Sequence, residues 1–153
     1  MKNTKGYDEN RREHMRVRAR LHFCISVIEG VNHETSTFNY GACFCTATSD
    51  VSLGGICVTH DGSLKPGAEV EISTPEKMTQ MACLSCEKAF LYKNELDLEP
   101  IYGRVRWVTN DRCGIEFIKL AVRNENILSK YIWEEHLSSV RSKKAQVVRQ
   151  KKF

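Results

Sequence analysis

Hydrophobic and polar residues alternate in several short segments of the chain, with the two-residue period of half-buried β-strands. In residues 21–31 the apolar face carries Leu21, Phe23, Ile25 and Val27. Similar segments, rich in β-branched and aromatic residues, lie at residues 41–49, 56–60, 68–73, 102–108 and 115–118. About six short strands of this kind predict a mainly β fold, a six-stranded antiparallel β-barrel that closes on itself.

Turn-forming residues separate these predicted strands. Residues 50–55, Asp-Val-Ser-Leu-Gly-Gly, have the composition of a turn. Residues 61–67, Asp-Gly-Ser-Leu-Lys-Pro-Gly, predict a hairpin loop between the third and fourth strands, and residues 109–114 predict the turn of a closing hairpin.

Two segments have the pattern of helices. Thr74, Pro75 and Glu76 combine a capping threonine, a proline at the first helical position and an early acid. They predict a helix over residues 75–92, although residues 81–92 could equally form a long strand. A C-terminal helix is predicted over residues 121–148, and its apolar side carries Ile127, Leu128, Tyr131, Ile132, His136, Leu137 and Val140.

Length and composition predict a single domain with two extensions. The chain has 153 residues, of which 41% are hydrophobic and 27% charged. The predicted parts are a basic arm at 1–20, the barrel at 21–120, the helix at 121–148 and a basic tail at 149–153. We expect a cytoplasmic protein without membrane insertion, because the sequence contains no run of 18 apolar residues and its first residues lack the apolar region of a signal peptide.

The net charge of +4 is distributed unevenly along the chain. Residues 1–20 carry seven bases against three acids, and residues 141–153 carry six bases and no acid. The segment between them therefore has ten bases and sixteen acids. Because this body is acidic, we do not expect it to bind nucleic acid through overall charge.

Seven cysteines are present, an odd number in a chain without an export signal, and they are expected to be reduced. Cys43 and Cys45 form a C-x-C pair, and Cys83 and Cys86 form a C-x-x-C pair. The two pairs together could supply four thiolates to zinc. Packing as small hydrophobic residues is the favoured interpretation, because both pairs lie among apolar neighbours, and no metal site or cofactor is predicted.

The sequence contains none of the common catalytic motifs, such as a His-Glu-x-x-His zinc motif, a phosphate-binding glycine loop or a Gly-x-Ser-x-Gly elbow. The five histidines are scattered over the predicted arm, strands, loop and helix. We therefore predict that the protein is not an enzyme and has no catalytic residues.

Three arginines of the arm, Arg11, Arg12 and Arg16, form an Arg-Arg-x-x-x-Arg pattern. An arginine side chain presents a rigid fork of donors that matches phosphate oxygens and also the O6 and N7 acceptors of guanine. An arginine-rich arm on its own is usually a solvated tail. Together with a complementary partner surface, it is a candidate site for a guanine nucleotide.

The predicted turn at residues 50–55 supplies that partner surface. The carboxylate of Asp50 only accepts hydrogen bonds, so it is complementary to the N1–H and N2–H edge of guanine, and Ser52 can donate or accept beside it. Gly54 and Gly55 permit a tight turn and a close approach of ligand to backbone.

The arginine pattern and the D-x-S-x-x-G turn, in this order, resemble the signature of the PilZ domain, a bacterial receptor for the second messenger cyclic di-GMP. Residues 103–108 and 113–117 resemble the closing hairpin of that family, and the resemblance covers roughly residues 10–120. It implies a six-stranded barrel with a C-terminal helix. It also implies cyclic di-GMP as ligand, commonly as an intercalated dimer, and a role in motility or biofilm regulation.

The resemblance also implies residue roles. Arg12 and Arg16 would clasp the ligand with help from Arg11, Asp50 and Ser52 would take the guanine edge, and Gly54 and Gly55 would keep the turn clear of the base. Trp107 would pack near the ligand, with a hairpin-flanking or interior position as the alternative. The leading hypothesis is thus a cyclic di-GMP receptor whose arm changes conformation on binding and signals to a protein partner.

Two alternatives remain open from the sequence. A ligand-independent PilZ-like interaction module would use residues 74–100 and the C-terminal helix to dock a protein. A single-stranded nucleic-acid-binding barrel is disfavoured by the acidic body and by an aromatic content of only 8%.

Overall fold

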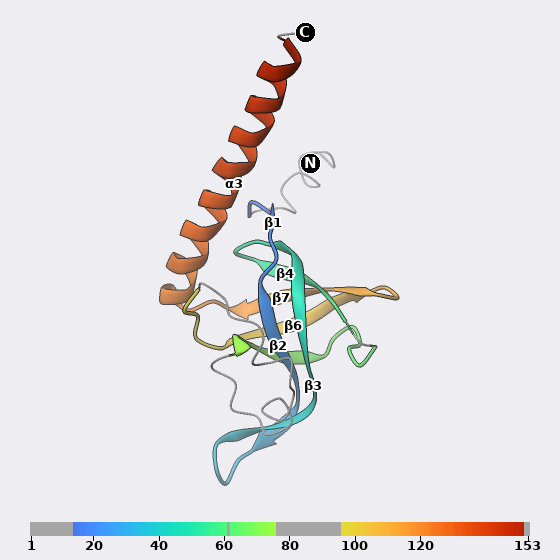
Figure 1. Cartoon of the computed structure of the whole chain (residues 1–153). Helices are drawn as coiled ribbons and strands as arrows, with labels where there is room; N and C mark the ends of the chain where they lie inside the picture. Colours follow the sequence, from blue (N-terminus) through green and yellow to red (C-terminus); the bar gives the residue numbers. More distant parts are fainter. Residues whose placement is uncertain (1–13, 61, 76–95, 152–153) are drawn as a thin grey trace, which may run out of the picture.

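The protein is a closed six-stranded antiparallel barrel with a long C-terminal helix, as expected from the sequence (Figure 1). The computed structural model describes residues 14–60, 62–75 and 96–151. The strands are β1 (Val17–Arg18), β2 (His22–Asn32), β3 (Thr37–Val51), β4 (Gly55–Thr59), β5 (Glu69–Ser73), β6 (Ile101–Val108) and β7 (Arg112–Lys119). The order around the barrel is β3-β2-β5-β6-β7-β4, and β4 returns to β3. The short β1 pairs with the end of β3.

One predicted connection is wrong. Residues 61–67 were expected to form a hairpin loop, but β4 pairs with β3 and β7, whereas β5 pairs with β2 and β6. The chain therefore crosses from one part of the barrel to another between β4 and β5. Leu64 in this crossover is buried in the core, and Gly62 and Gly67 have φ values of 93° and 90°. Because β4 pairs with both β3 and β7, the barrel is closed at this point and leaves no unpaired strand edge there.

The alternation in β2 correctly predicts which side chains enter the core. Leu21, Phe23 and Ile25 are buried among the inward-facing residues of the other strands. The opposite face of β2 is not solvent-facing along its whole length, however, because Cys24 and Ser26 are both 0% exposed. This part of the barrel wall is buried on both sides.

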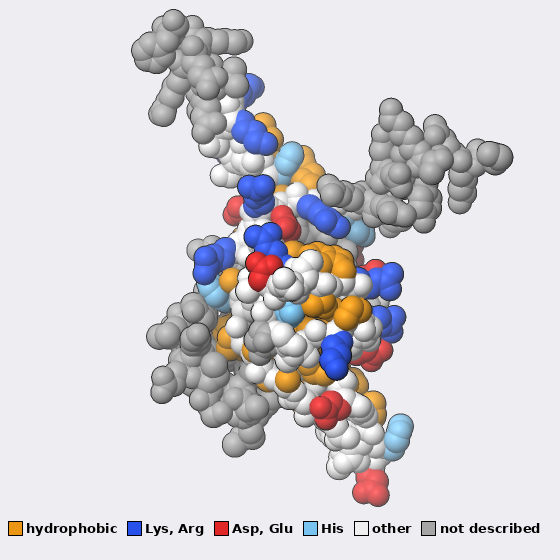
Figure 2. All heavy atoms as spheres, turned by 90° about the vertical axis from the view of Figure 1, so that its right-hand side faces the viewer, with side chains coloured by type: hydrophobic (Ala, Val, Ile, Leu, Met, Phe, Trp, Pro, Cys, Tyr) orange, Lys and Arg blue, Asp and Glu red, His pale blue; other side chains and the backbone are white. Residues whose placement is uncertain are grey.

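The helix α3 (Val122–Lys151) is anchored to the barrel near its start. Leu128 and Ile132 are buried in the barrel core, and the side chain of Asn124 exchanges two hydrogen bonds with the backbone of Glu99. Val140, which was predicted on the apolar side, is 45% exposed. The second half of the helix runs away from the barrel, and its described Lys and Arg side chains lie exposed along it (Figures 1 and 2).

Several predicted features lie outside the described residues. They are the helix at 75–92 beyond its first residue, the arginines Arg11 and Arg12, and the Cys83–Cys86 pair. Within the described residues, no helix combines the length and the apolar character needed to cross a membrane.

The expectation that all cysteines are reduced is wrong at Cys43, which is disulfide-bonded. Cys24, Cys45, Cys57 and Cys113 are not in disulfides. Among the residues that the structure describes, no group of three His, Cys, Asp or Glu side chains is arranged to hold a metal ion.

Candidate ligand-binding site

The turn between β3 and β4 is held by the side chain of Ser52. Val51 pairs with Ile56 across the turn, so the chain reverses within four residues. The Ser52 N–H donates to the Gly55 carbonyl at 3.0 Å, and its Oγ accepts from the N–H groups of Gly54 and Gly55 at 3.1 and 3.2 Å. Ser52 therefore shapes the turn from within, and its predicted contact with a guanine edge remains a prediction.

Both glycines of this turn have close neighbours, and at Gly55 the neighbour is backbone. A Cβ added at Gly55 would lie 2.2 Å from the carbonyl oxygen of Ile115, which is backbone of β7 and cannot give way easily. At Gly54 an added Cβ would lie 2.9 Å from the ring of His14. Both glycines thus allow neighbouring parts of the protein to approach the turn, in addition to the ligand approach predicted from the sequence.

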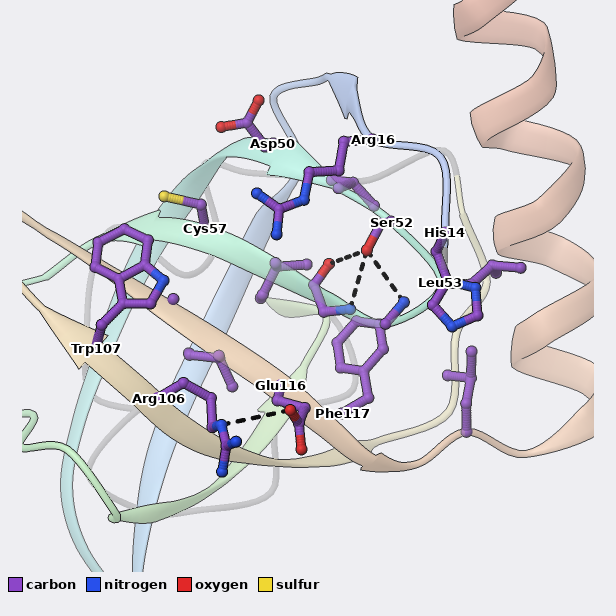
Figure 3. A pocket seen from close by; sticks show the side chains of 17 residues that line it. His14, Arg16, Asp50, Ser52, Leu53, Cys57, Arg106, Trp107, Glu116 and Phe117 are labelled. Atoms are coloured by element: carbon purple, nitrogen blue, oxygen red, sulfur yellow. Dashed lines mark hydrogen bonds and ion pairs between the residues drawn. The ribbon is translucent and has the colours of Figure 1, made fainter. Parts of the chain in front are cut away.

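The segment just before β1 brings Arg16, the last arginine of the Arg-Arg-x-x-x-Arg pattern, to this turn. In β1, Val17 pairs with Val51 and Arg18 pairs with Asp50, and the Val17 side chain is buried in the core. This pairing fixes the backbone next to Arg16. The structure therefore brings together Arg16, Asp50 and Ser52, as the sequence predicted, around a single cavity (Figure 3).

An irregularity in β3 affects the position of Asp50. Thr48 pairs with Val58, but Asp50 pairs with Cys57, so Ser49 is an extra residue in β3 relative to β4. A bulge of this kind breaks strand alternation and redirects the side chains beside it. Asp50 consequently lines the cavity next to the turn.

A second irregularity, in β6, shapes the opposite part of the cavity wall. Val105 pairs with Ile115 and Trp107 pairs with Gly114, so Arg106 is the extra residue. Arg106 and Trp107 are both exposed and both line the cavity. The Trp107 indole, 45% exposed, lies directly against Gly114, where a Cβ would come within 2.2 Å of the indole nitrogen.

The cavity has a volume of about 610 Å³, within the range of small-molecule sites. Besides the predicted residues, it is lined by side chains that the sequence did not reveal: His14, Leu53, Cys57, Arg106, Glu116 and Phe117 (Figure 3). Arg106 was missed because strict alternation does not anticipate the bulge. The turn signature at residues 50–55 gives no sign that β7 would supply Glu116 and Phe117.

The cavity combines three kinds of chemistry. The Arg16 guanidinium offers donors to anionic oxygens, the Asp50 carboxylate offers acceptors, and Trp107 offers an exposed aromatic surface. Arg106 pairs with Glu116 at 3.4 Å at the same rim, and both side chains are more than half exposed, so this ion pair is weak and can open. The arrangement suits an anionic ligand that also carries a flat base with donor groups.

The fold is thus a closed β-barrel domain with a cavity beside the β3–β4 turn, and comparison with known families identifies which barrel family it is. The chain belongs to the PilZ family, since the family model described as PilZ domain matches residues 10–134. This range includes every described residue that lines the cavity. No curated protein sequence matches the chain significantly.

Two solved structures with the same fold are compared with this chain. One is the inhibitor of motility MotI (DgrA) from Bacillus subtilis, 16% identical with a TM-score of 0.56, where the match covers 83% of this chain and 52% of MotI. The chain thus spans about half the length of MotI. The other is the PilZ domain of YcgR from Escherichia coli with c-di-GMP, 14% identical with a TM-score of 0.51, covering 88% of this chain and 98% of that domain. These likenesses show the fold.

Proposed function

We propose that this protein is a receptor for cyclic di-GMP and binds it in the cavity beside the β3–β4 turn. The observation that carries the proposal is that Arg16, Asp50 and Trp107, from three separate parts of the sequence, line the same cavity. The structure of the YcgR PilZ domain with c-di-GMP supports the same ligand.

Each of these side chains matches one part of the ligand. Arg16 would bind a phosphate or the O6 and N7 edge of a guanine, and Asp50 would accept from guanine N1–H and N2–H. Trp107 would stack on a base, as aromatic side chains do with nucleobases. Arg11 and Arg12 precede Arg16 closely in sequence and would add donors to the phosphates, with Ser52, Gly54 and Gly55 holding the shape of the turn.

Ligand binding would also act on the N-terminal arm. Arg16 directly precedes β1, whose Val17 is inserted in the core. A ligand that holds Arg16 and the preceding arginines would fix the arm against the barrel, changing its shape and neutralising its charge. A protein partner that reads this change would complete a signalling function in which the protein acts as an adaptor without catalysing a reaction.

Isothermal titration calorimetry with cyclic di-GMP tests the proposal. Arg16→Ala is expected to weaken binding by about 1–3 kcal/mol, roughly five- to 150-fold, which is the contribution of a bidentate arginine–guanine contact. Arg141→Ala is the matched control, because Arg141 is exposed on α3 away from the cavity and its loss should leave the affinity unchanged. An intercalated ligand dimer predicts two ligand molecules per chain.

The outcomes separate this function from its alternative. Equal binding by the wild type and Arg16→Ala would remove the assignment of Arg16. If the wild type does not bind at all, while its protein partners bind equally with and without nucleotide, the chain is a ligand-independent interaction module.

A further inference from the structure

A group of cysteines lies on the outer face of the β2–β3 pair, away from the ligand cavity. Cys24 pairs with Cys45, and Ser26 pairs with Cys43, as direct neighbours in the antiparallel ladder. Since alternate residues of a strand share a face, these four side chains lie on one side of the sheet, opposite the core residues Phe23 and Ile25. Cys43 and Cys45 pack against the buried Cys24.

Within this group, Cys24 and Cys45 have the geometry of a disulfide precursor. Their Sγ atoms are 3.2 Å apart, and neither residue is in a disulfide. Directly opposed residues of an antiparallel pair have Cα atoms about 4.5–5.5 Å apart, which lies inside the range that a disulfide spans. Small side-chain rotations would bring the two sulfurs to bonding distance without a change in strand register.

The two thiols also differ in their exposure to solvent. Cys24 is 0% exposed, whereas Cys45 is partly exposed. The neighbouring Cys43 is already disulfide-bonded, and its Sγ accepts a hydrogen bond from Ser26 at 3.3 Å. An oxidant from solvent would therefore meet Cys45 first, and Cys24 is the sulfur placed to react with the product.

We propose that Cys24 and Cys45 form a site of reversible oxidation, in which a hydroperoxide converts the thiol pair into a cross-strand disulfide. The Cys45 thiolate attacks the terminal peroxide oxygen, the O–O bond breaks, and Cys45 becomes a sulfenic acid while water or an alcohol leaves. The sulfur of Cys24 then attacks the Cys45 sulfur, the S–S bond forms, and the hydroxyl leaves as water with the Cys24 proton. Two thiols supply the two electrons that reduce the peroxide, and an external dithiol reverses the step by thiol–disulfide exchange.

A second pair of cysteines shows that a position on adjacent strands is not sufficient for two cysteines to form a disulfide. Cys57 and Cys113 lie on the adjacent strands β4 and β7, but Cys57 pairs with Gly114 and Cys113 pairs with Val58. Their side chains therefore point to opposite faces: Cys57 lines the ligand cavity and Cys113 lies in the core. Burial, with a smaller effect from Cys57, raises the pKa of Cys113 to about 11, so this thiol stays protonated. This pair is an internal control.

The test treats the full chain with hydrogen peroxide, blocks remaining thiols by alkylation, and maps the peptides by mass spectrometry. We expect a peptide pair linked through Cys24 and Cys45 that disappears on treatment with dithiothreitol, and no link between Cys57 and Cys113. Cys45→Ser should abolish the link, whereas the matched variant Cys57→Ser should leave it unchanged. The oxidised wild type should also unfold at a higher temperature than the reduced form, because the new bond closes a loop in the unfolded chain.

Three results would overturn the proposal. Cys24 and Cys45 could be alkylated to the same extent before and after peroxide treatment, or Cys45 could be oxidised irreversibly without a link to Cys24. The third result is a disulfide between Cys45 and a cysteine other than Cys24. Because the wild-type peptide map alone decides between these outcomes, a variant that fails to fold does not affect the conclusion. The cyclic di-GMP titration depends on other residues, so either proposal can fail without the other.

Discussion

At the scale of single residues, the cavity beside the β3–β4 turn is shaped by two bulges. Ser49 in β3 and Arg106 in β6 are extra residues in their strands, and the side chains beside them, Asp50 and Trp107, line the same cavity. The sequence predicted Asp50 from its acceptor chemistry in the turn at residues 50–55, and Trp107 from the resemblance to the PilZ family. It did not predict Arg106, because a period of two assigns every second residue of a strand to the same face and a bulge breaks that period.

Asp50 should read the 2-amino group of guanine. In calorimetric titrations, Asp50→Ala is expected to lose about 1–3 kcal/mol of cyclic di-GMP binding, because the acceptor for N1–H and N2–H is removed. Cyclic di-IMP, which lacks the 2-amino group, should bind the wild type more weakly than cyclic di-GMP, and this difference should shrink in Asp50→Ala.

Asp111→Ala is the control for this experiment, since Asp111 is an exposed carboxylate in the β6–β7 turn outside the cavity. A preference for cyclic di-GMP over cyclic di-IMP that persists undiminished in Asp50→Ala would assign base recognition to another residue.

At the scale of elements, local sequence predicted the strands, the C-terminal helix and the closing hairpin of β6 and β7, but not the crossover between β4 and β5. The alternation of Leu21, Phe23 and Ile25 correctly predicts β2 and its inner face. The partner of β4 could not be predicted in the same way, because Cys57 and Gly114 are far apart in the sequence and no local pattern relates them. For the same reason, the docking role of Asn124 was not visible within an apolar helical pattern.

Asn124 should be a principal anchor of α3. Its side chain is 1% exposed, accepts from the Glu99 N–H at 3.0 Å and donates to the Glu99 carbonyl at 3.1 Å. Asn124→Ala leaves both backbone groups without these partners, so we expect the free energy of unfolding in urea to fall by about 1–3 kcal/mol.

Asn126→Ala is the matched control, because Asn126 lies on the same turn of the helix but is exposed. The role of Asn124 as an anchor would be contradicted if both variants unfolded at the same urea concentration as the wild type.

At the scale of the whole molecule, the residues that anchor α3 to the barrel and the basic residues of its C-terminal segment lie in different parts of the helix. Within the part of α3 whose side chains the structure describes, residues 122–144, the last buried residue is Ile132, whereas Arg141, Lys143 and Lys144 are exposed. The basic C-terminal segment found in the sequence therefore begins on a part of the helix that leaves the barrel.

Removal of residues 141–153 should consequently leave the barrel intact. We expect the free energy of unfolding to change by no more than about 0.5 kcal/mol, as for surface changes in general, and cyclic di-GMP affinity to be unchanged. A longer deletion of residues 131–153 should be clearly destabilising, because it also removes the buried Ile132. Equal destabilisation by both deletions would show that the exposed half of the helix contributes to the fold.

The pairing of β4 with β7 also has a consequence for how the protein folds. This pairing joins residues 55–59 to residues 112–116, so barrel closure must bring together segments separated by a long stretch of chain. Long-range contacts of this kind carry a high loop-closure entropy and slow folding. The proposed binding cavity lies along this same junction, between the β3–β4 turn and residues 114–117 of β7. A nucleotide bound there would contact both sides of this long-range junction, so it would slow unfolding by holding β4 and β7 together.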